Sequence, residues 1–238
     1  MAEIEIFGME FPRFIQIFII QGLFAVFFIF MAYKIIKRGK KRLNLYLSSF
    51  YLFSGVGGII NMIYANLKQE VVVYALHFTT YYLICFALVF VLVFVLILIK
   101  PSNTLGTKTQ ILILSISGIL LLGLLLIPNG ITINTSTNWK PNWSLGFFIY
   151  SVIICTFIII IPTIYYSIMI YSKFENQQLK KKWKYFLMGL FAYFFLYYGT
   201  SFSNTLNDDN FRLIWSLISL PTLIALYLIY YGVGRQLV

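Results

Sequence analysis

Charged side chains are scarce in this chain of 238 residues: they make up 11% of it, while 61% of the residues are hydrophobic and the mean hydropathy is +0.88. Soluble globular domains carry about 25% charged and about 45–50% apolar residues. A soluble fold of this size could not bury so much apolar side-chain surface. The composition therefore excludes a soluble globular domain, and we expect lipid to be the solvent for most of the chain.

Histidine and cysteine are nearly absent, with one histidine, His77, and two cysteines, Cys85 and Cys155. A single histidine cannot build a two-histidine metal site, and the cysteines form no CxxC pattern. No grouping of side chains suggests general acid–base or nucleophilic catalysis. We therefore predict a protein that is not an enzyme, with no catalytic residue, no bound metal and no cofactor.

Acidic residues are also few, with 7 Asp and Glu against 18 Lys and Arg, for a net charge of +11. In a soluble protein this excess would suggest nucleic-acid binding. Here the basic residues lie in short loops between apolar runs, a pattern that is typical of membrane topology. The expected partner is the lipid bilayer, and no nucleic acid is expected.

Long apolar runs dominate what is present, and a helix needs roughly 20 apolar residues to cross the hydrocarbon core. The runs show no strand-like alternation, and lipid offers no partner for unpaired backbone groups, so helices are predicted. The expected fold is all-α, a polytopic membrane protein consisting of one seven-transmembrane-helix domain. The seven helices are predicted at about 14–36, 45–67, 71–99, 109–127, 145–171, 183–206 and 211–231.

Basic residues are unevenly shared between the two sets of loops. One set and its flanks hold 14 of the Lys and Arg residues, including the segments 34–42 and 173–184, and the other set holds 4. Short cytoplasmic loops are enriched in Lys and Arg. The asymmetry predicts an N-terminus outside, a C-terminus in the cytoplasm and a multi-pass location in the cell membrane.

With this orientation, polar residues gather in the outer halves of several predicted helices, whereas the inner half of 71–99 is apolar. Polar groups in lipid are costly and tend to face a bundle interior or a water-filled cavity. We predict an outward-facing, ligand-binding cavity. Its candidate residues are Gln21, Asn61, His77, Tyr81, Asn204 and Trp215. The alternative is that these side chains are interhelical hydrogen-bond partners, with His77 at headgroup depth.

Several further expectations concern loops and helix ends. The longest outer loop either folds over the mouth of the bundle or anchors at the interface through Trp139 and Trp143, and we favour anchoring. Asp208 and Asp209 precede the last helix and are expected to cap it, and Arg212 is expected to pair with Asp208 or Asp209. Prolines in two helices are expected to bend them, either as hinges or as static kinks. They are Pro162 and Pro221.

The order of these features resembles the N-terminal seven-transmembrane sensor region of membrane histidine kinases. The shared features are a basic segment entering helix two, a long helix three ending in Lys-Pro, an outer loop with tryptophans, and a basic start to helix six. They read KRGKKRLNLYLSSFYLFSGVG, LILIKPS, NWKPNWSLGFFIYSVI and LKKKWKYFLMGLFAYFFLYYGTSFSN. The resemblance implies a sensor, but a dimerisation helix and a kinase domain are missing, and no binding residue transfers from the family.

The leading functional prediction is a non-enzymatic sensor or receptor-like module that binds a small or lipid-like ligand in the outer cavity. It would signal to a cytoplasmic partner, and a homodimer is a further expected assembly. Two alternatives stay open: a small-molecule transporter, and a structural subunit of a membrane complex. A cavity closed at mid-depth favours the receptor, a continuous path favours transport, and a filled bundle favours a structural role.

Overall fold

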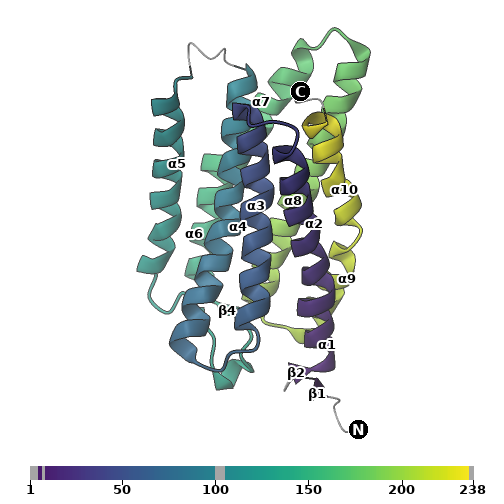
Figure 1. The fold of residues 1–238 in the computed structure, drawn as a ribbon. Helices are drawn as coiled ribbons and strands as arrows, with labels where there is room; N and C mark the ends of the chain where they lie inside the picture. Colours follow the sequence, from purple (N-terminus) through teal and green to yellow (C-terminus); the bar gives the residue numbers. More distant parts are fainter. Residues whose placement is uncertain (1–4, 7–8, 100–104, 236–238) are drawn as a thin grey trace.

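The computed structural model describes residues 5–6, 9–99 and 105–235 and is an all-α bundle of long, roughly parallel helices (Figure 1). Glu3 and Lys100, which entered the charge analysis, lie outside these residues, as does the predicted Lys-Pro end of helix three. The helices are α1 (Phe11–Phe14), α2 (Gly22–Ile36), α3 (Arg42–Tyr64), α4 (Glu70–Ile99), α5 (Thr107–Leu122), α6 (Leu145–Ile153), α7 (Ile161–Lys173), α8 (Gln177–Leu206), α9 (Asp209–Ser219) and α10 (Thr222–Ile229).

Non-α turns and short strands complete the described chain. Three π-helical segments occur: η1 (Ile15–Gln21), η4 (Ile154–Ile160) and η5 (Tyr230–Gly234). Two 3₁₀ turns occur: η2 (Gly123–Leu126) and η3 (Thr135–Thr137). Antiparallel two-residue strands pair β1 (Glu5–Ile6) with β2 (Met9–Glu10), and β3 (Ile131–Thr132) with β4 (Asn142–Trp143).

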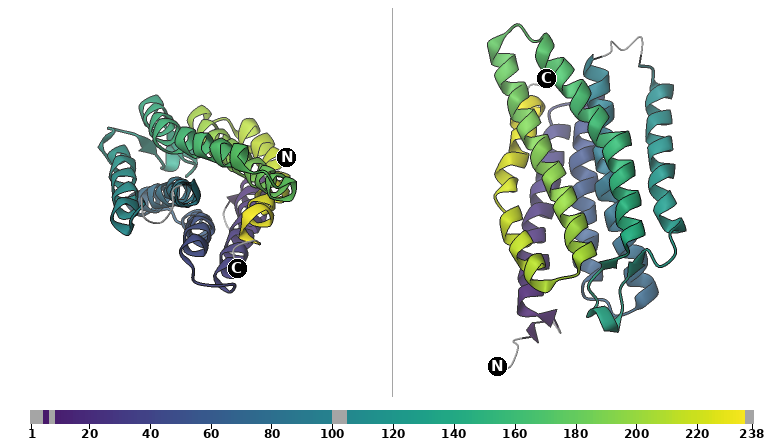
Figure 2. Two further views of the ribbon diagram at one scale, coloured as in Figure 1. Left: turned by 90° about the horizontal axis from the view of Figure 1, so that it is seen from above. Right: turned by 180° about the vertical axis from the view of Figure 1, so that it is seen from behind.

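Six helical segments are long and apolar enough to cross a membrane, and a bent pair, 209–219 with 222–234, makes a seventh candidate among the described residues. The outward faces of the bundle carry large apolar side chains such as Val26, Ile119, Phe157 and Ile224, which are 62–75% exposed. Apolar side chains on every outer face are compatible with a multi-pass membrane protein. The chain begins its first helix, α1, at one end of the bundle and ends α10 toward the other (Figures 1 and 2).

The most buried of the candidate spans is α4, which packs against α3, α5 and α7. Its C-terminal half is apolar on all sides, and most of its side chains are buried against other helices. Small residues on α3 let the neighbouring helices approach closely. A Cβ added at Gly58 would lie 3.0 Å from the Ala25 Cβ, and one at Gly57 would lie 3.2 Å from the Thr80 carbonyl oxygen.

Some boundaries differ from the prediction for physical reasons. The sixth run begins at Gln177 rather than near 183, because Asn176 caps the helix by accepting from the backbone N–H groups of Gln178 (2.8 Å) and Leu179 (3.3 Å). The basic LKKK segment is therefore helical. The second run is shifted toward the N-terminus, to Arg42–Tyr64, because the polar segment 65–69 forms the turn into α4.

The two prolines behave differently. The chain is bent by 48° between α9 and α10, at Pro221, so the predicted single helix 211–231 is broken. Backbone carbonyl oxygens next to the break accept hydrogen bonds from side-chain hydroxyl groups. Thr222 Oγ1 donates to Ser219 O at 2.5 Å, and Ser219 Oγ donates to Ser216 O at 2.7 Å. Pro162 instead follows the π-helical turn η4, and Leu145–Lys173 remains one span.

Candidate functional site

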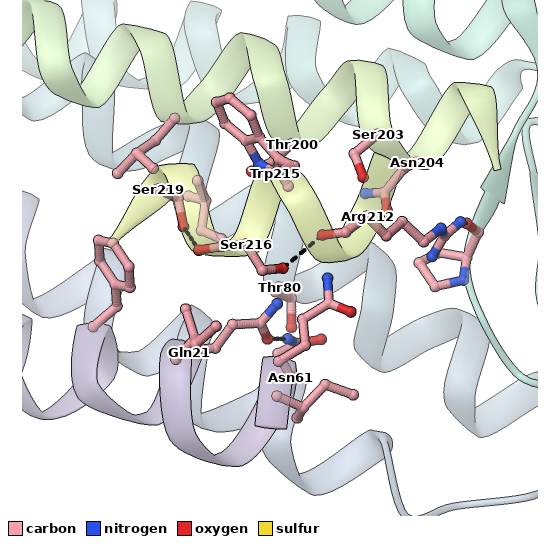
Figure 3. Close-up of a pocket in the computed structure, with 18 of the residues that line it drawn as sticks. Gln21, Asn61, Thr80, Thr200, Ser203, Asn204, Arg212, Trp215, Ser216 and Ser219 are labelled. Atoms are coloured by element: carbon pink, nitrogen blue, oxygen red, sulfur yellow. Dashed lines mark hydrogen bonds between the residues drawn. The ribbon is translucent and has the colours of Figure 1, made fainter. Parts of the chain in front are cut away.

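A cavity of about 350 Å³ lies within the half of the bundle nearest the N-terminus, between η1, α2, α3, α4, α8 and α9 (Figure 3). Side chains from η1 and α3 lie on one side of it, and those of α9 lie on the other. All six side chains that the sequence singled out line this cavity. They are Gln21, Asn61, His77, Tyr81, Asn204 and Trp215. That they bind a ligand stays a prediction.

His77, on the second turn of α4, is buried and has a partner on each ring nitrogen. Trp143 Nε1–H donates to His77 Nε2 at 3.0 Å, and the Tyr64 hydroxyl lies 2.7 Å from His77 Nδ1. Because Nε2 accepts, it carries no proton, and the neutral ring must carry its proton on Nδ1. Nδ1–H then donates to the Tyr64 oxygen. His77 is therefore a fixed, neutral link between α3, α4 and the loop before α6.

Trp143 does not act as an interfacial anchor, contrary to our expectation. It is 3% exposed, and its ring centroid lies 4.5 Å from that of Tyr81 and 5.0 Å from that of Phe147. The strand pair β3–β4 holds it there, with Ile131 opposite Trp143. The long loop thus folds over the end of the bundle, since the indole finds a hydrogen-bond acceptor only inside.

Tyr81 presents its ring to the cavity, but its hydroxyl is engaged elsewhere. The hydroxyl bonds with Ser151 Oγ and lies 3.2 Å from the Tyr197 hydroxyl. Tyr197 in turn donates to the Ser151 carbonyl at 3.1 Å. This buried network joins α4, α6 and α8, so the Tyr81 hydroxyl fits the alternative of interhelical hydrogen bonding.

The other predicted residues lie closer to open space. Asn61 Nδ2 donates to Gln21 Oε1 across η1 and α3. Trp215 Nε1 donates to Thr200 Oγ1 at 3.2 Å, which joins α9 to α8. Thr80 Oγ1, on the turn of α4 after His77, is buried without a hydrogen-bond partner. A buried, unsatisfied hydroxyl at a cavity wall marks a place for a water or a ligand atom.

Helix α9 turns its polar face inward and its apolar face outward. Arg212, Ser216 and Ser219 are buried, while Ile214 and Leu217 are each 54% exposed. In a soluble protein this pattern would be reversed. The inverted pattern fits a helix that has lipid on one side and a polar cavity on the other.

Arg212 does not pair with Asp208 or Asp209, which corrects the expectation from the sequence. Its Nη2 donates to Pro141 O at 2.5 Å and to Asn207 Oδ1 at 2.9 Å. Asp208 accepts from Phe211 N at 2.6 Å and is the predicted N-cap of α9. The Asp209 carboxylate is instead held by Lys140 Nζ, at 2.9 and 3.0 Å, because the folded loop brings that lysine to the first turn of α9.

An aromatic layer closes the cavity near the middle of the bundle. Tyr193 meets Phe50 with ring centroids 4.8 Å apart, and its hydroxyl lies 2.8 Å from Ser54 Oγ. Phe28 covers the same place from α2, 6.1 Å from Tyr193. Beyond this layer, the inner half is filled with buried side chains such as Tyr51 and Phe94, both 0% exposed. Phe28 and Tyr193 line the cavity at this layer, which forms its floor.

Sequence reasoning missed several members of the site. Tyr64 and His77 face each other because a short turn joins α3 to α4. Two helices joined by a short turn are antiparallel neighbours, and this could have predicted the pair from the sequence. Lys140 and Arg13 entered only as topology charges, although both line the cavity, and Arg13 donates to Asn138 O (2.6 Å) and Trp139 O (2.7 Å). Among the described residues, no cluster of three His, Cys, Asp or Glu side chains could hold a metal ion.

Comparison with protein-family models, curated proteins and solved structures finds no match to this chain, so its classification follows from its own geometry: an all-α bundle with six or seven helices able to span a membrane.

Proposed function

We propose that this chain is a seven-span membrane receptor or sensor module that binds a small or lipid-like ligand in its outer cavity. A cytoplasmic partner reads the resulting change in helix arrangement, and a second copy of the chain is a further candidate partner. The observation that carries the proposal is the cavity itself, which is lined by polar groups from six helical segments and closed by the aromatic layer of Phe28, Phe50 and Tyr193.

The shape of the cavity supports a receptor over the two alternatives. A transporter needs a route that opens to either side, whereas the inner half of this bundle is packed with buried side chains. A purely structural subunit has no need of a cavity, and protein interiors are otherwise close-packed. The resemblance to the sensor region of histidine kinases points to the same function.

The orientation follows from the positive-inside rule and has a direct test. Both native cysteines are buried, so a membrane-impermeant maleimide should label the parent chain weakly. In intact cells we expect it to label the Ser136→Cys variant, which lies in the outer loop. The Lys181→Cys variant, at the start of α8, should react only after permeabilisation. The reverse pattern would invert the proposed topology and place the cavity on the cytoplasmic side.

Occupancy of the cavity is tested by filling it. The Leu196→Trp substitution places an indole among the lining residues of α8, whereas Leu206→Trp makes the same change at a 48% exposed position on that helix. After purification from native membranes in mild detergent, native mass spectrometry should detect a retained small molecule on the parent chain and on Leu206→Trp. We expect it to be lost from Leu196→Trp.

A parent chain that carries no molecule, in extracts from several growth conditions, would contradict the receptor proposal. Retention by Leu196→Trp would place the bound molecule elsewhere. Flux of the retained molecule across reconstituted vesicles would favour the transporter instead.

A further inference from the structure

Arg212 is a buried cation that the protein satisfies incompletely. It is 7% exposed and lines the cavity. A guanidinium has five N–H donors, yet within the described chain both of its hydrogen bonds leave from Nη2. Nε is buried without any partner. Both acceptors are neutral oxygens, so the positive charge has no carboxylate in direct contact.

The surroundings of Arg212 add to this positive potential. The guanidinium belongs to the first turn of α9, where the helix dipole is also positive. Asp209, the one acid among the described residues that line the cavity, is held by Lys140 rather than by Arg212. A buried and unpaired charge is costly and is normally compensated by an ion of opposite sign. The missing element is an anion.

The rest of the cavity is apolar toward its floor. Ile20, Phe24, Phe28, Ile84 and Leu196 line it there. At about 30 Å³ for each water-sized group, a volume of about 350 Å³ holds on the order of a dozen non-hydrogen atoms. A compact head group with a chain of roughly ten carbons has this size.

We infer that the cavity takes an amphiphile with a compact anionic oxygen head, either a carboxylate or a phosphate, which the Arg212 guanidinium receives while the aliphatic chain extends toward Phe28. The inference rests on the proposed function and names the ligand class of the same site. Arg is suited to this because its planar fork meets carboxylate and phosphate oxygens with two parallel hydrogen bonds.

The test uses the full chain in non-ionic detergent micelles and isothermal titration with three probes of equal chain length: decanoate, decyl phosphate and decanol. At least one anionic probe should bind about tenfold or more tightly than decanol, since hydrogen bonds to charged groups are the stronger ones. Comparison of the two anions then separates a carboxylate-headed ligand from a phosphate-headed one. Acetate and inorganic phosphate alone should bind weakly, because they lack the chain.

Variants assign the preference to Arg212. Arg212→Gln should weaken binding of the preferred anion by roughly 10- to 100-fold, and leave decanol binding unchanged. Arg235→Gln makes the same change at an exposed position after η5, at the opposite end of the bundle, and should alter neither. Arg212→Lys, which keeps the charge, should retain part of the preference and covers the case in which Arg212→Gln fails to fold.

Equal binding of decanol and both anions, or an anion preference that survives in Arg212→Gln, would overturn the inference. If Leu196→Trp then abolishes all binding, the receptor proposal stands without the anionic head. If no probe binds, the inference fails, and the molecule retained in native mass spectrometry decides the receptor proposal separately.

Discussion

Replacing His77 with phenylalanine should lower the free energy of unfolding by about 2–5 kcal/mol, because it leaves two buried polar groups unsatisfied. Trp143 Nε1–H loses its acceptor at 3.0 Å, and the Tyr64 hydroxyl loses its partner at 2.7 Å. The loop that carries Trp143 should loosen as well. Unfolding in mixed micelles with increasing sodium dodecyl sulfate would measure the stability, and proteolysis of the 128–144 loop would measure its order.

The matched control is Thr79→Val, two residues further along α4 on an exposed face, where a change of no more than about 0.5 kcal/mol is expected. A double-mutant cycle with Trp143→Phe sharpens the result. Removing both His77 and Trp143 should cost less than the sum of the single changes, since the indole N–H that His77→Phe leaves without an acceptor is then absent. Strictly additive effects would refute the hydrogen-bonded link.

Replacing Gly189 with alanine should destabilise the bundle by about 1–3 kcal/mol through overpacking. A Cβ at this position of α8 would lie 2.8 Å from both the Ala225 carbonyl oxygen and the Ile229 backbone nitrogen. Those atoms belong to the backbone of α10, so relief requires the whole helix to move. Helix propensity alone would predict the opposite sign, a gain of about 1 kcal/mol in the free energy of unfolding. The direction of the measured change therefore shows whether overpacking or helix propensity dominates.

Gly106→Ala is the control for this substitution, because a Cβ there meets nothing within 4 Å. Its stability, measured by the same unfolding titration, should stay within about 0.5 kcal/mol of the parent. Stabilisation by Gly189→Ala would mean that α10 does not lie directly on α8. Since α9 lines the cavity and leads into α10, the attachment of α10 to α8 also bears on how the proposed signal leaves the cavity.

The all-α class with apolar, span-length helices and six of the cavity-lining residues could be predicted from the sequence alone. Hydropathy fixes where helices must lie, because lipid leaves the backbone no other way to satisfy its hydrogen bonds. The cost of polar groups in lipid then directs residues such as Gln21, Asn61 and Asn204 inward from their separate helices. These are properties of each helix on its own, so they can be predicted from its composition and periodicity.

The partners of those residues were decided only by the tertiary structure. Trp143 is a buried hydrogen-bond donor to His77 because the β3–β4 pair folds the loop inward. Lys140 binds the Asp209 carboxylate, which had been expected to pair with Arg212. Pro221 interrupts its span whereas Pro162 follows a π-helical turn within an unbroken one. Such outcomes depend on which helices are neighbours and on how they are aligned along the bundle. The sequence of a single helix does not determine either. Whether a segment is apolar enough to lie in lipid is a property of that segment alone. Hydrogen-bond pairing, and the lack of a carboxylate partner for Arg212 among the described residues, depend instead on which distant segments of the chain are in contact.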